Sequence, residues 1–330
     1  MPGRGARQRV TAADIAREVG VSRATVGFVL NNTPGQTISA GTRDRVMAAA
    51  SRMGYRPHRA AQALASGHSR IILFVVPDWP VDYSMRRYLE EASLLLDEAG
   101  YSMVTYTPHP SGRSRPLWES LNPDVVVGFT SFSSQDLKSL RASGVTRIIP
   151  SVEEAGTGFH ESPALTAGPA LQAKHLYERG HRRVVFAASG DRRLEPVVGE
   201  RAEAARAACE RSGLEWHGSH AANRERTAGL VSAWLAEGIT GVIAYNDDTA
   251  AAVVSAAVRA GVHVPEDLAV VGHDDSPLAS VFVPSLSSVR VDTGALGRAL
   301  AQRALDEALG RTPALGHLPV AAELVQREST

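Results

Sequence analysis

Polar side chains that could bind or transform a small molecule follow two apolar runs of the chain. Asn246 and Asp247 end the run Gly241–Tyr245, and Asp274 follows the run Leu268–Gly272. Carboxylate and amide groups in such places suit a ligand with neighbouring hydroxyl groups. A structural alternative stays open for all three residues; Asp274, with Asp275, could be a turn residue before Pro277. Ligand binding is favoured for Asp274, whereas the two interpretations are balanced for Asn246 and Asp247.

Two aromatic residues follow the first apolar run, Ile71–Val76. Trp79 and Tyr83 could form a wall against the face of a sugar ring or a flat heterocycle. They could equally be core residues, and the core interpretation is favoured for Trp79.

Catalysis and metal binding have weaker support. His217 and His220 form an H-x-x-H pair without a third ligand pattern nearby, and His273 beside two aspartates resembles a hydrolytic cluster. The sequence contains no phosphate loop, no G-x-S-x-G elbow, and no G-x-G-x-x-G after an apolar run. We therefore predict no catalytic residue, no metal and no cofactor. An enzyme remains the rival class, and turnover of a bound molecule would distinguish it.

These residues need a scaffold, and alternating apolar runs and helical patterns supply one. The predicted strands are Ile71–Val76, Tyr101–Thr107, Val125–Phe129, Arg147–Pro150, Val184–Ala188, Gly241–Tyr245 and Leu268–Gly272. The predicted helices include Met85–Ala99, Leu171–Arg179, Arg201–Ser212, Ala228–Glu237 and Thr249–Ala260. Such alternation indicates parallel sheets covered by helices. The pattern restarts near Leu171, so we expect two doubly wound halves with a ligand cleft at the carboxyl ends of their strands.

Composition separates the first 70 residues from the other 260. Residues 1–70 carry eleven arginines and three acids, a net charge of +8, and residues 71–330 carry −8. A basic module on an acidic body suggests binding to nucleic acid. The single cysteine, Cys209, cannot form an internal disulfide, which favours a reducing cytoplasm. No run reaches the about 18 apolar residues that span a bilayer, so no membrane partner is expected.

The basic segment has the pattern of a helix-turn-helix. Thr11 is a predicted N-cap for a helix reaching Val19, and Gly20 ends that helix. Ser22 caps a second helix, and Ser39 caps a third. Two short helices joined by a turn containing glycine place the N-terminus of the second helix in the DNA major groove.

The residues of this segment resemble those of a known family. TAADIAREVGVSRATV, VLN and ISAGTRDRVMAAASRMGYRPHRAAQAL are similar to the head of the lactose-repressor (LacI/GalR-type) family of bacterial transcriptional regulators. The resemblance implies an operator-binding head followed by a hinge helix, Arg59–Ala65, that forms on DNA. Its leucine, Leu64, would enter the minor groove. The DNA-contacting residues implied are Thr11, Ser22, Arg23, Ala24, Thr25, Phe28, Asn31, Arg59, Ala61, Gln62 and Leu64.

The same resemblance continues through the body. VVPD, HLYERGHRRV, AYNDD, VPEDLAVVGHDD, PSLSSV and ELVQREST all match. The implied core is like a periplasmic sugar-binding protein, with strands crossing between its subdomains near Leu165, Val291 and Leu318. The resemblance assigns Arg201, at the start of a helix, to the effector site. The effector-contacting residues expected are Tyr83, Arg201, Asn246, Asp247 and Asp274.

Three residues depart from the family pattern. Gly27 and Phe28 replace a serine that contacts phosphate and an arginine that reads a base edge, so the operator sequence is expected to differ. Ala167 stands where members often carry an acid that meets the sugar. The effector, its direction of action and the target genes are left open.

The sequence therefore predicts an all-α helix-turn-helix head joined to an α/β core of two doubly wound parallel-sheet subdomains. The expected domains are 9–57 for DNA binding, 58–69 for the hinge and 70–330 for the core. Within the core, 70–165 and 292–318 form one subdomain, and 166–291 and 319–330 the other. The expected function is a cytoplasmic homodimeric repressor that binds palindromic double-stranded operator DNA and is controlled by a carbohydrate effector.

Overall fold

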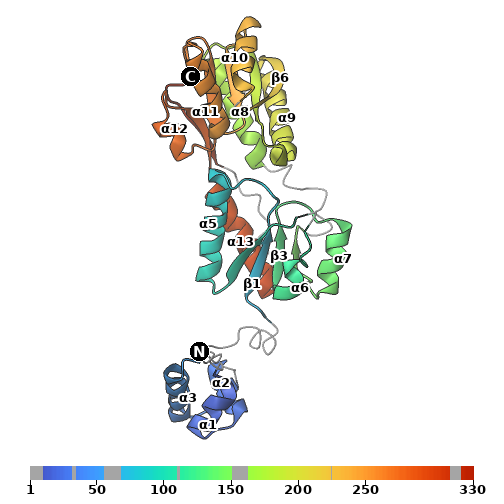
Figure 1. Cartoon of the computed structure of the whole chain (residues 1–330), viewed down its shortest axis with the longest axis vertical. Coiled ribbons are helices and arrows are strands. Elements are labelled where there is room, and N and C mark those ends of the chain that lie inside the picture. Colours follow the sequence, from blue (N-terminus) through green and yellow to red (C-terminus); the bar gives the residue numbers. More distant parts are fainter. Residues whose placement is uncertain are drawn as a thin grey trace, which may run out of the picture. The chain divides into compact units, whose positions relative to one another are not determined.

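The computed structural model describes residues 10–31, 35–55, 68–109, 112–150, 163–223, 225–312 and 321–330. The chain divides into two compact units, residues 1–70 and residues 71–330. Figure 1 shows the helices and strands of each unit.

The described part of the first unit contains α1 (Ala12–Val19), α2 (Arg23–Leu30) and α3 (Ala40–Arg52). The three predicted caps are confirmed: Thr11, Ser22 and Ser39 each accept a hydrogen bond from a backbone N–H in the first turn of their helix. The three helices enclose a small core of Ile15, Val26, Val29, Val46, Ala49 and their neighbours. This core fixes the angle between α1 and α2, so the predicted head architecture is confirmed.

The first sheet of the second unit has the strand order β2-β1-β3-β4, and all its strands are parallel. The strands are β1 (Ile71–Val75), β2 (Ser102–Tyr106), β3 (Val125–Gly128) and β4 (Ile148–Ile149). Its helices are α5 (Tyr83–Glu98), α6 (Leu117–Leu121), α7 (Ser134–Ala142) and α13 (Thr293–Leu309). Successive β1 side chains enter opposite cores, Phe74 toward α5 and α13, and Leu73 toward Trp118 and Leu140.

The helix α13 joins this sheet from a distant part of the sequence and lies beside α5 (Figure 1). A Cβ atom at Gly297 would lie 2.1 Å from the carbonyl oxygen of Tyr88. Glycine at this position therefore permits the close approach of the two helix backbones.

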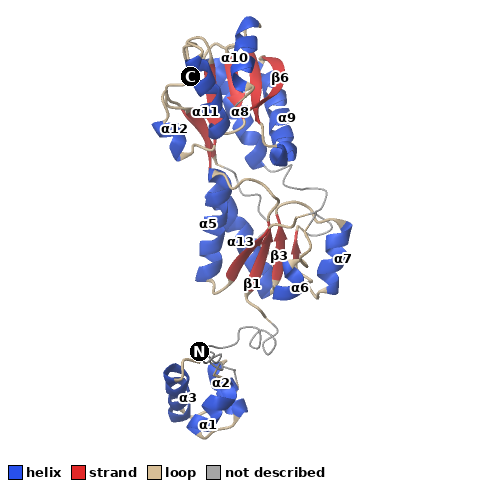
Figure 2. Cartoon of the chain, in the orientation of Figure 1, coloured by secondary structure: helices blue, strands red, loops and turns tan. Residues whose placement is uncertain are grey.

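The second sheet has the order β10-β9-β8-β7-β5-β6, in which only the pair of β10 and β9 is antiparallel among the described strands. The strands are β5 (Arg183–Ser189), β6 (Glu215–Ala222), β7 (Gly241–Ala244), β8 (Ala269–His273), β9 (Ser287–Val291) and β10 (Ala322–Val325). Its helices are α8 (Pro163–Glu178), α9 (Glu195–Ser212), α10 (Thr227–Ala236), α11 (Asp247–Arg259) and α12 (Pro277–Val281). Helices α8 and α9 pack on one face around Phe186, and α10 and α11 pack on the other around Val185. Figure 2 shows these helices flanking the strands.

The predicted α/β architecture is confirmed, but several of the described elements were not predicted. The strand β6 was missed because it is an edge strand of His, Ser and Gly with little burial. The strand β10 and the helices α6, α7, α12 and α13 were also absent from the predicted elements. Of the predicted crossings, Val291 ends β9, Leu165 lies within α8 instead of a strand, and Leu318 lies outside the described residues.

Candidate functional site

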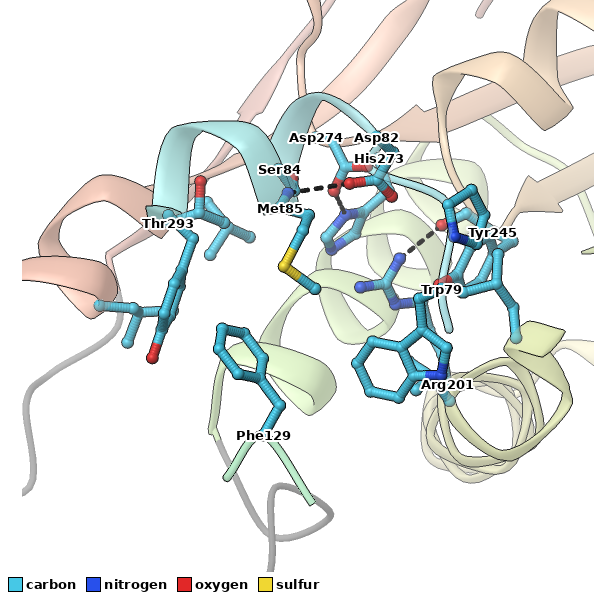
Figure 3. A pocket seen from close by; sticks show the side chains of 16 residues that line it. Trp79, Asp82, Ser84, Met85, Phe129, Arg201, Tyr245, His273, Asp274 and Thr293 are labelled. Atoms are coloured by element: carbon cyan, nitrogen blue, oxygen red, sulfur yellow. Dashed lines mark hydrogen bonds and ion pairs between the residues drawn. The ribbon is translucent and has the colours of Figure 1, made fainter. Parts of the chain in front are cut away.

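A cavity in the second unit is lined by sixteen residues from both sheets (Figure 3). They come from the segment after β1 and the start of α5, from the ends of β3, β7 and β8, from the start of α9, and from the turn between β9 and α13. Strands of parallel sheets end here, which is where such folds place ligands. The polar lining consists of Asp82, Ser84, Arg201, Tyr245, His273, Asp274 and Thr293.

Arg201 brings a buried positive charge to the cavity. Only 8% of the residue is exposed, and Nη1 donates to the carbonyl oxygen of Tyr245 at 2.7 Å. The guanidinium lies 4.6 Å from the centre of the Tyr245 ring, and Nε has no hydrogen-bond partner among the described residues. Buried donors without partners are costly, so a ligand that accepts from this guanidinium would be bound favourably.

The predicted position of Arg201 at the start of a helix is wrong. α9 begins at Glu195, so Arg201 lies almost two turns inside it. Pro196 occupies the first turn, where its missing N–H costs nothing, and Gly199 follows within the helix. These two residues break the helical pattern in the sequence without breaking the helix.

Asp274 and His273 form a buried pair at the end of β8. The His273 Nδ1 and the Asp274 Oδ1 lie 2.7 Å apart, and neither residue is more than 8% exposed. Burial acts to raise the pKa of Asp274, but the neighbouring His273, Arg201 and Ser84 hydroxyl bring it below its ordinary value. Burial and the charge of Arg201 lower the pKa of His273. The pair therefore consists of an aspartate anion and a neutral imidazole.

A turn in an unusual backbone conformation presents this carboxylate. Asp274 has a φ of 96° and Asp275 a φ of 45°, both in the left-handed region, which aspartate tolerates better than most residues. Asp275 is held by Arg290 and by Arg327, whose Nη2 donates to it at 2.6 Å. These ion pairs keep the turn, and with it Asp274, in place.

Asp82 is a cavity residue that sequence reasoning missed. Its carboxylate caps α5 by accepting from the Met85 N–H at 2.9 Å. Burial, and next the negative charge of Asp274, raise its pKa. The usable signal was an aspartate three residues before Met85, where a helical pattern was predicted to begin.

The remaining wall is apolar and aromatic. Met85, Tyr88, Phe129, Leu194, Val197 and Leu296 line it, together with Trp79. Trp79 is half-buried and packs against the core of the second sheet, as the favoured interpretation predicted, and it also lines the cavity. The cavity thus pairs charged groups with a broad apolar surface, which suits a ligand that has one polar edge and one apolar face.

Three predicted effector contacts do not line this cavity. Tyr83 lines an adjoining groove that shares Asp274, Val291 and Thr293 with the cavity, and the guanidinium of Arg86 lies 5.6 Å from the centre of its ring. Asn246 caps α11, with Oδ1 accepting from the N–H and hydroxyl of Thr249. Asp247 is almost fully buried, with Oδ2 accepting from the Ser276 N–H at 2.6 Å. The polar atoms of Asn246 and Asp247 make hydrogen bonds within the protein, which a position at the end of a strand does not reveal.

Asp247 supports the site indirectly. Its Oδ1 accepts from the hydroxyl of Ser288 at 2.6 Å, and that hydroxyl oxygen accepts from the Asp275 N–H at 3.0 Å. Asp247 therefore anchors the turn that carries Asp274.

Burial raises the pKa of Asp247 to about 7, above its value in an unfolded chain. The folded protein then holds this proton more tightly, so its stabilising effect is complete below about pH 4 and is lost as the pH rises through 7. The unfolding free energy of the wild type should therefore fall between pH 5 and pH 8. We expect this fall to be smaller in Asp247→Asn by on the order of 2 kcal/mol. Urea denaturation at both pH values measures this slope. Asp97→Asn, at an exposed position of α5, should keep the wild-type slope, and an unchanged slope in Asp247→Asn would contradict the assignment.

Most of the predicted DNA-contacting residues that the structure describes lie at the ends of α1 and α2, and Phe28 lies within α2. Thr11, Ser22, Arg23, Ala24 and Asn31 are exposed, and Thr25 is half-buried with its hydroxyl 2.8 Å from that of Ser22. The Thr11 hydroxyl donates a hydrogen bond to the Asp14 carboxylate at 2.7 Å. Phe28 is half-buried but does not pack against the head core. Arg59, Ala61, Gln62 and Leu64 lie outside the described residues.

Two features are absent from the part of the chain that the structure describes. No group of three or more His, Cys, Asp or Glu side chains there could hold a metal ion. No helix there is both long and apolar enough to cross a membrane.

Comparison with known proteins defines the class. Residues 11–58 match the model of bacterial regulatory proteins of the lacI family, and residues 173–330 match a periplasmic binding protein-like domain. The HTH-type transcriptional regulator MalR of Streptomyces coelicolor is 32% identical over 348 residues, which cover 96% of this chain and 96% of that protein. The chain belongs to the LacI family of bacterial regulatory proteins, as the sequence resemblance predicted. It is a transcriptional regulator with a DNA-binding head and an effector-binding core.

Solved structures show the same fold. The lac repressor dimer bound to operator and the anti-inducer ONPF is similar with a TM-score of 0.77 and 23% identity, covering 98% of this chain and 99% of that one. The complex of the transcriptional regulator CelR with cellobiose has a TM-score of 0.63 and 25% identity, covering 98% of this chain and 100% of that one.

Proposed function

We propose that this protein is a homodimeric repressor of a palindromic operator and that a neutral carbohydrate in the cavity controls its affinity for DNA. The observation that carries the proposal is the cavity itself, where buried Arg201 and Asp274 face an aromatic wall. An arginine donor and a carboxylate acceptor suit neighbouring hydroxyl groups, and aromatic rings suit the apolar face of a sugar. The similar regulator CelR was solved with cellobiose.

The charges of the cavity favour an uncharged ligand. Asp82 and Asp274 supply two acidic groups, and Arg201 supplies one positive charge. An anionic ligand such as a sugar phosphate would bring further negative charge against both carboxyl groups, and this repulsion is strong in a buried site.

We propose that the site binds its ligand without turnover. A serine hydrolase needs a histidine between the serine and the acid, so that the imidazole takes the serine proton. Here the Asp274 carboxylate stands in the middle. Its Oδ1 is hydrogen-bonded to Nδ1 of His273, and the hydroxyl of Ser84 stabilises it from the other side. Ser84 therefore meets the carboxylate and not the imidazole, and the serine–histidine–acid order of a serine hydrolase is not formed.

The proposed organisation follows the sequence-based boundaries: a DNA-binding domain at 9–57, a hinge at 58–69 and an effector and dimerisation core at 70–330, working in the cytoplasm. A single head reads too few base pairs for specific binding, whereas two heads related by a two-fold axis match two half-sites. Leu64 is proposed as the minor-groove wedge at the operator centre.

A selection from a random DNA library, followed by gel shift with the upstream region of its own operon, tests the function. We expect a palindromic site, and release by one member of a panel of neutral mono- and disaccharides. Binding without sequence preference, or conversion of a sugar during incubation with the protein, would contradict the proposal.

We expect Val283→Asp to weaken the proposed dimer. Three exposed apolar residues, Leu278, Val281 and Val283, stand in α12 and just after it, and we propose them as one apolar patch; Val283 is 83% exposed. A second copy of the chain would bury this patch, and an aspartate would then carry an unpaired charge into the interface. Sedimentation equilibrium should show that the dissociation constant of the dimer rises at least about tenfold. Leu309→Asp, on an exposed leucine of α13, is the matched control; equal behaviour of the two variants would place the interface elsewhere.

A further inference from the structure

We propose that His273 is a positioning residue that aims the Asp274 carboxylate into the cavity, and that Gly168 of α8 fixes the imidazole in the one tautomer that can do so. This inference rests on the proposed function, because it assigns a role within the same effector site. It identifies two residues that the sequence reasoning did not place in that site.

The first step concerns the proton of the imidazole. Asp274 Oδ1 lies 2.7 Å from Nδ1, and a carboxylate can only accept a hydrogen bond at this distance. Nδ1 must therefore carry the hydrogen, which leaves Nε2 of a neutral ring without one. Burial and Arg201 lower the pKa of His273, in agreement with a neutral ring.

The second step concerns the opposite edge of the ring. Nε2 is buried and has no hydrogen-bond partner among the described residues. A Cβ atom built on Gly168 would lie 2.1 Å from Nε2 and 2.4 Å from Cδ2, far inside contact distance. The imidazole thus occupies the space that any other residue at position 168 would fill, and an Nε2–H bond would meet no acceptor there.

The third step concerns the carboxylate. A hydrogen bond from Nδ1 occupies one oxygen of Asp274 and limits rotation of the side chain, although the backbone at this residue is in the left-handed region. Ser84 of α5 also acts on this carboxylate. His273 and Gly168 therefore determine which way Asp274 offers its remaining acceptor capacity to a ligand; Figure 3 shows His273 beside Asp274 in the cavity.

Two substitutions of His273 separate its donor from its ring. His273→Phe keeps a ring and removes the donor. His273→Asn keeps an N–H near the Nδ1 position and removes the far edge that meets Gly168. Gly168→Ala is expected to displace the imidazole, and His273→Asn in the same chain should make room for the new methyl group. Gly199→Ala is the matched control, because a Cβ atom there meets nothing within 4 Å and the residue is also a helical glycine.

NMR of the full chain without ligand measures the proposal directly. Nitrogen shifts of labelled histidine report the tautomer, and carboxyl carbon shifts of labelled aspartate report the titration of Asp274. We expect a bare Nε2 in the wild type. We also expect the titration midpoint of Asp274 to rise by about one pH unit in His273→Phe and in Gly168→Ala. It should return toward wild type in His273→Asn and in the double variant. A protonated Nε2, or a double variant no better than Gly168→Ala, would overturn the proposal.

A second measurement connects this geometry to regulation. With the sugar that releases the wild-type protein from operator DNA, His273→Phe and Gly168→Ala should need roughly tenfold more sugar, and His273→Asn less than about threefold more. If no sugar in the panel releases the wild type, the proposed function fails, while the NMR experiment still decides the role of His273. If Gly168→Ala does not fold, the two single His273 variants decide it.

Discussion

Replacing Asp274 with asparagine should leave operator binding intact and weaken effector binding by a factor of about 10 to 100. The Asp274 carboxylate is almost fully buried in the cavity, where the charge of Arg201 and the Ser84 hydroxyl stabilise its anion. Losing one hydrogen bond to a charged group typically costs about 1.5–3 kcal/mol of binding. Asparagine is the informative substitution, because it tolerates the φ of 96° at this residue and alanine does not.

Arg201→Met should have a similar effect, since it removes the buried guanidinium and keeps a chain of comparable length. Calorimetry with the sugar that releases the wild type measures the affinity, and gel shift without sugar confirms that the head still binds DNA. The matched controls are Arg206→Met, an exposed position on the same helix, and Asp267→Asn, an exposed aspartate shortly before β8. Unchanged sugar affinity in Asp274→Asn and Arg201→Met would place the effector elsewhere.

The sequence predicted the scaffold of this site better than its lining. Alternating apolar runs and helical stretches follow from burial on both faces of a parallel sheet, so most strands and helices were identified within a few residues. β6 was not, because an edge strand carries little apolar signal. α13 packs against the first sheet and α5, which lie far from it in the sequence, and the periodicity of a segment does not indicate which distant elements it contacts.

The site residues illustrate the same limit at the level of side chains. Asp274 and Asn246 both follow a parallel strand, yet Asp274 lines the cavity while Asn246 caps the next helix. The difference arises from the backbone. A left-handed turn at Asp274 directs its side chain into the cavity, whereas Asn246 has an N-cap conformation and its side chain accepts a hydrogen bond from the Thr249 N–H. Arg201 was found through the family resemblance. The role of His273 and Gly168 depends on a contact between α8 and β8, which are distant in the sequence, so it can be recognised only in the folded structure.

In the head, Phe28 stands where the family resemblance places a base-reading arginine. The neighbouring Val26 and Val29 are buried in the head core, whereas Phe28 is half-buried and does not pack against that core. On an α-helix, side chains at 100° intervals place residue 28 away from residues 26 and 29. The structure therefore favours an outward phenyl ring over the alternative in which Phe28 completes the core.

An outward phenyl ring has no hydrogen-bond donor and can only pack against the thymine methyl group in the major groove, whereas arginine binds guanine O6 and N7 together. We expect Phe28→Arg to change the preferred base at one position of each half-site, from thymine toward guanine, with discrimination changing by about 1–3 kcal/mol. The melting temperature of the head should hardly change. Binding to a library of operator variants measures the preference, and circular dichroism of the full chain follows stability.

Gly27→Ser provides the matched control on the same turn of α2. A Cβ atom at Gly27 meets nothing within 4 Å, so serine fits there and should stabilise the helix slightly, because glycine in a helix interior costs about 0.5–1 kcal/mol. A serine at this position contacts phosphate in the family pattern, and phosphate contacts strengthen binding to all sequences alike. Gly27→Ser should therefore raise affinity without moving the base preference, whereas Phe28→Arg should move the preference. If Phe28→Arg instead lowers binding to every sequence together and unfolds the head, Phe28 is a core residue and does not read the operator.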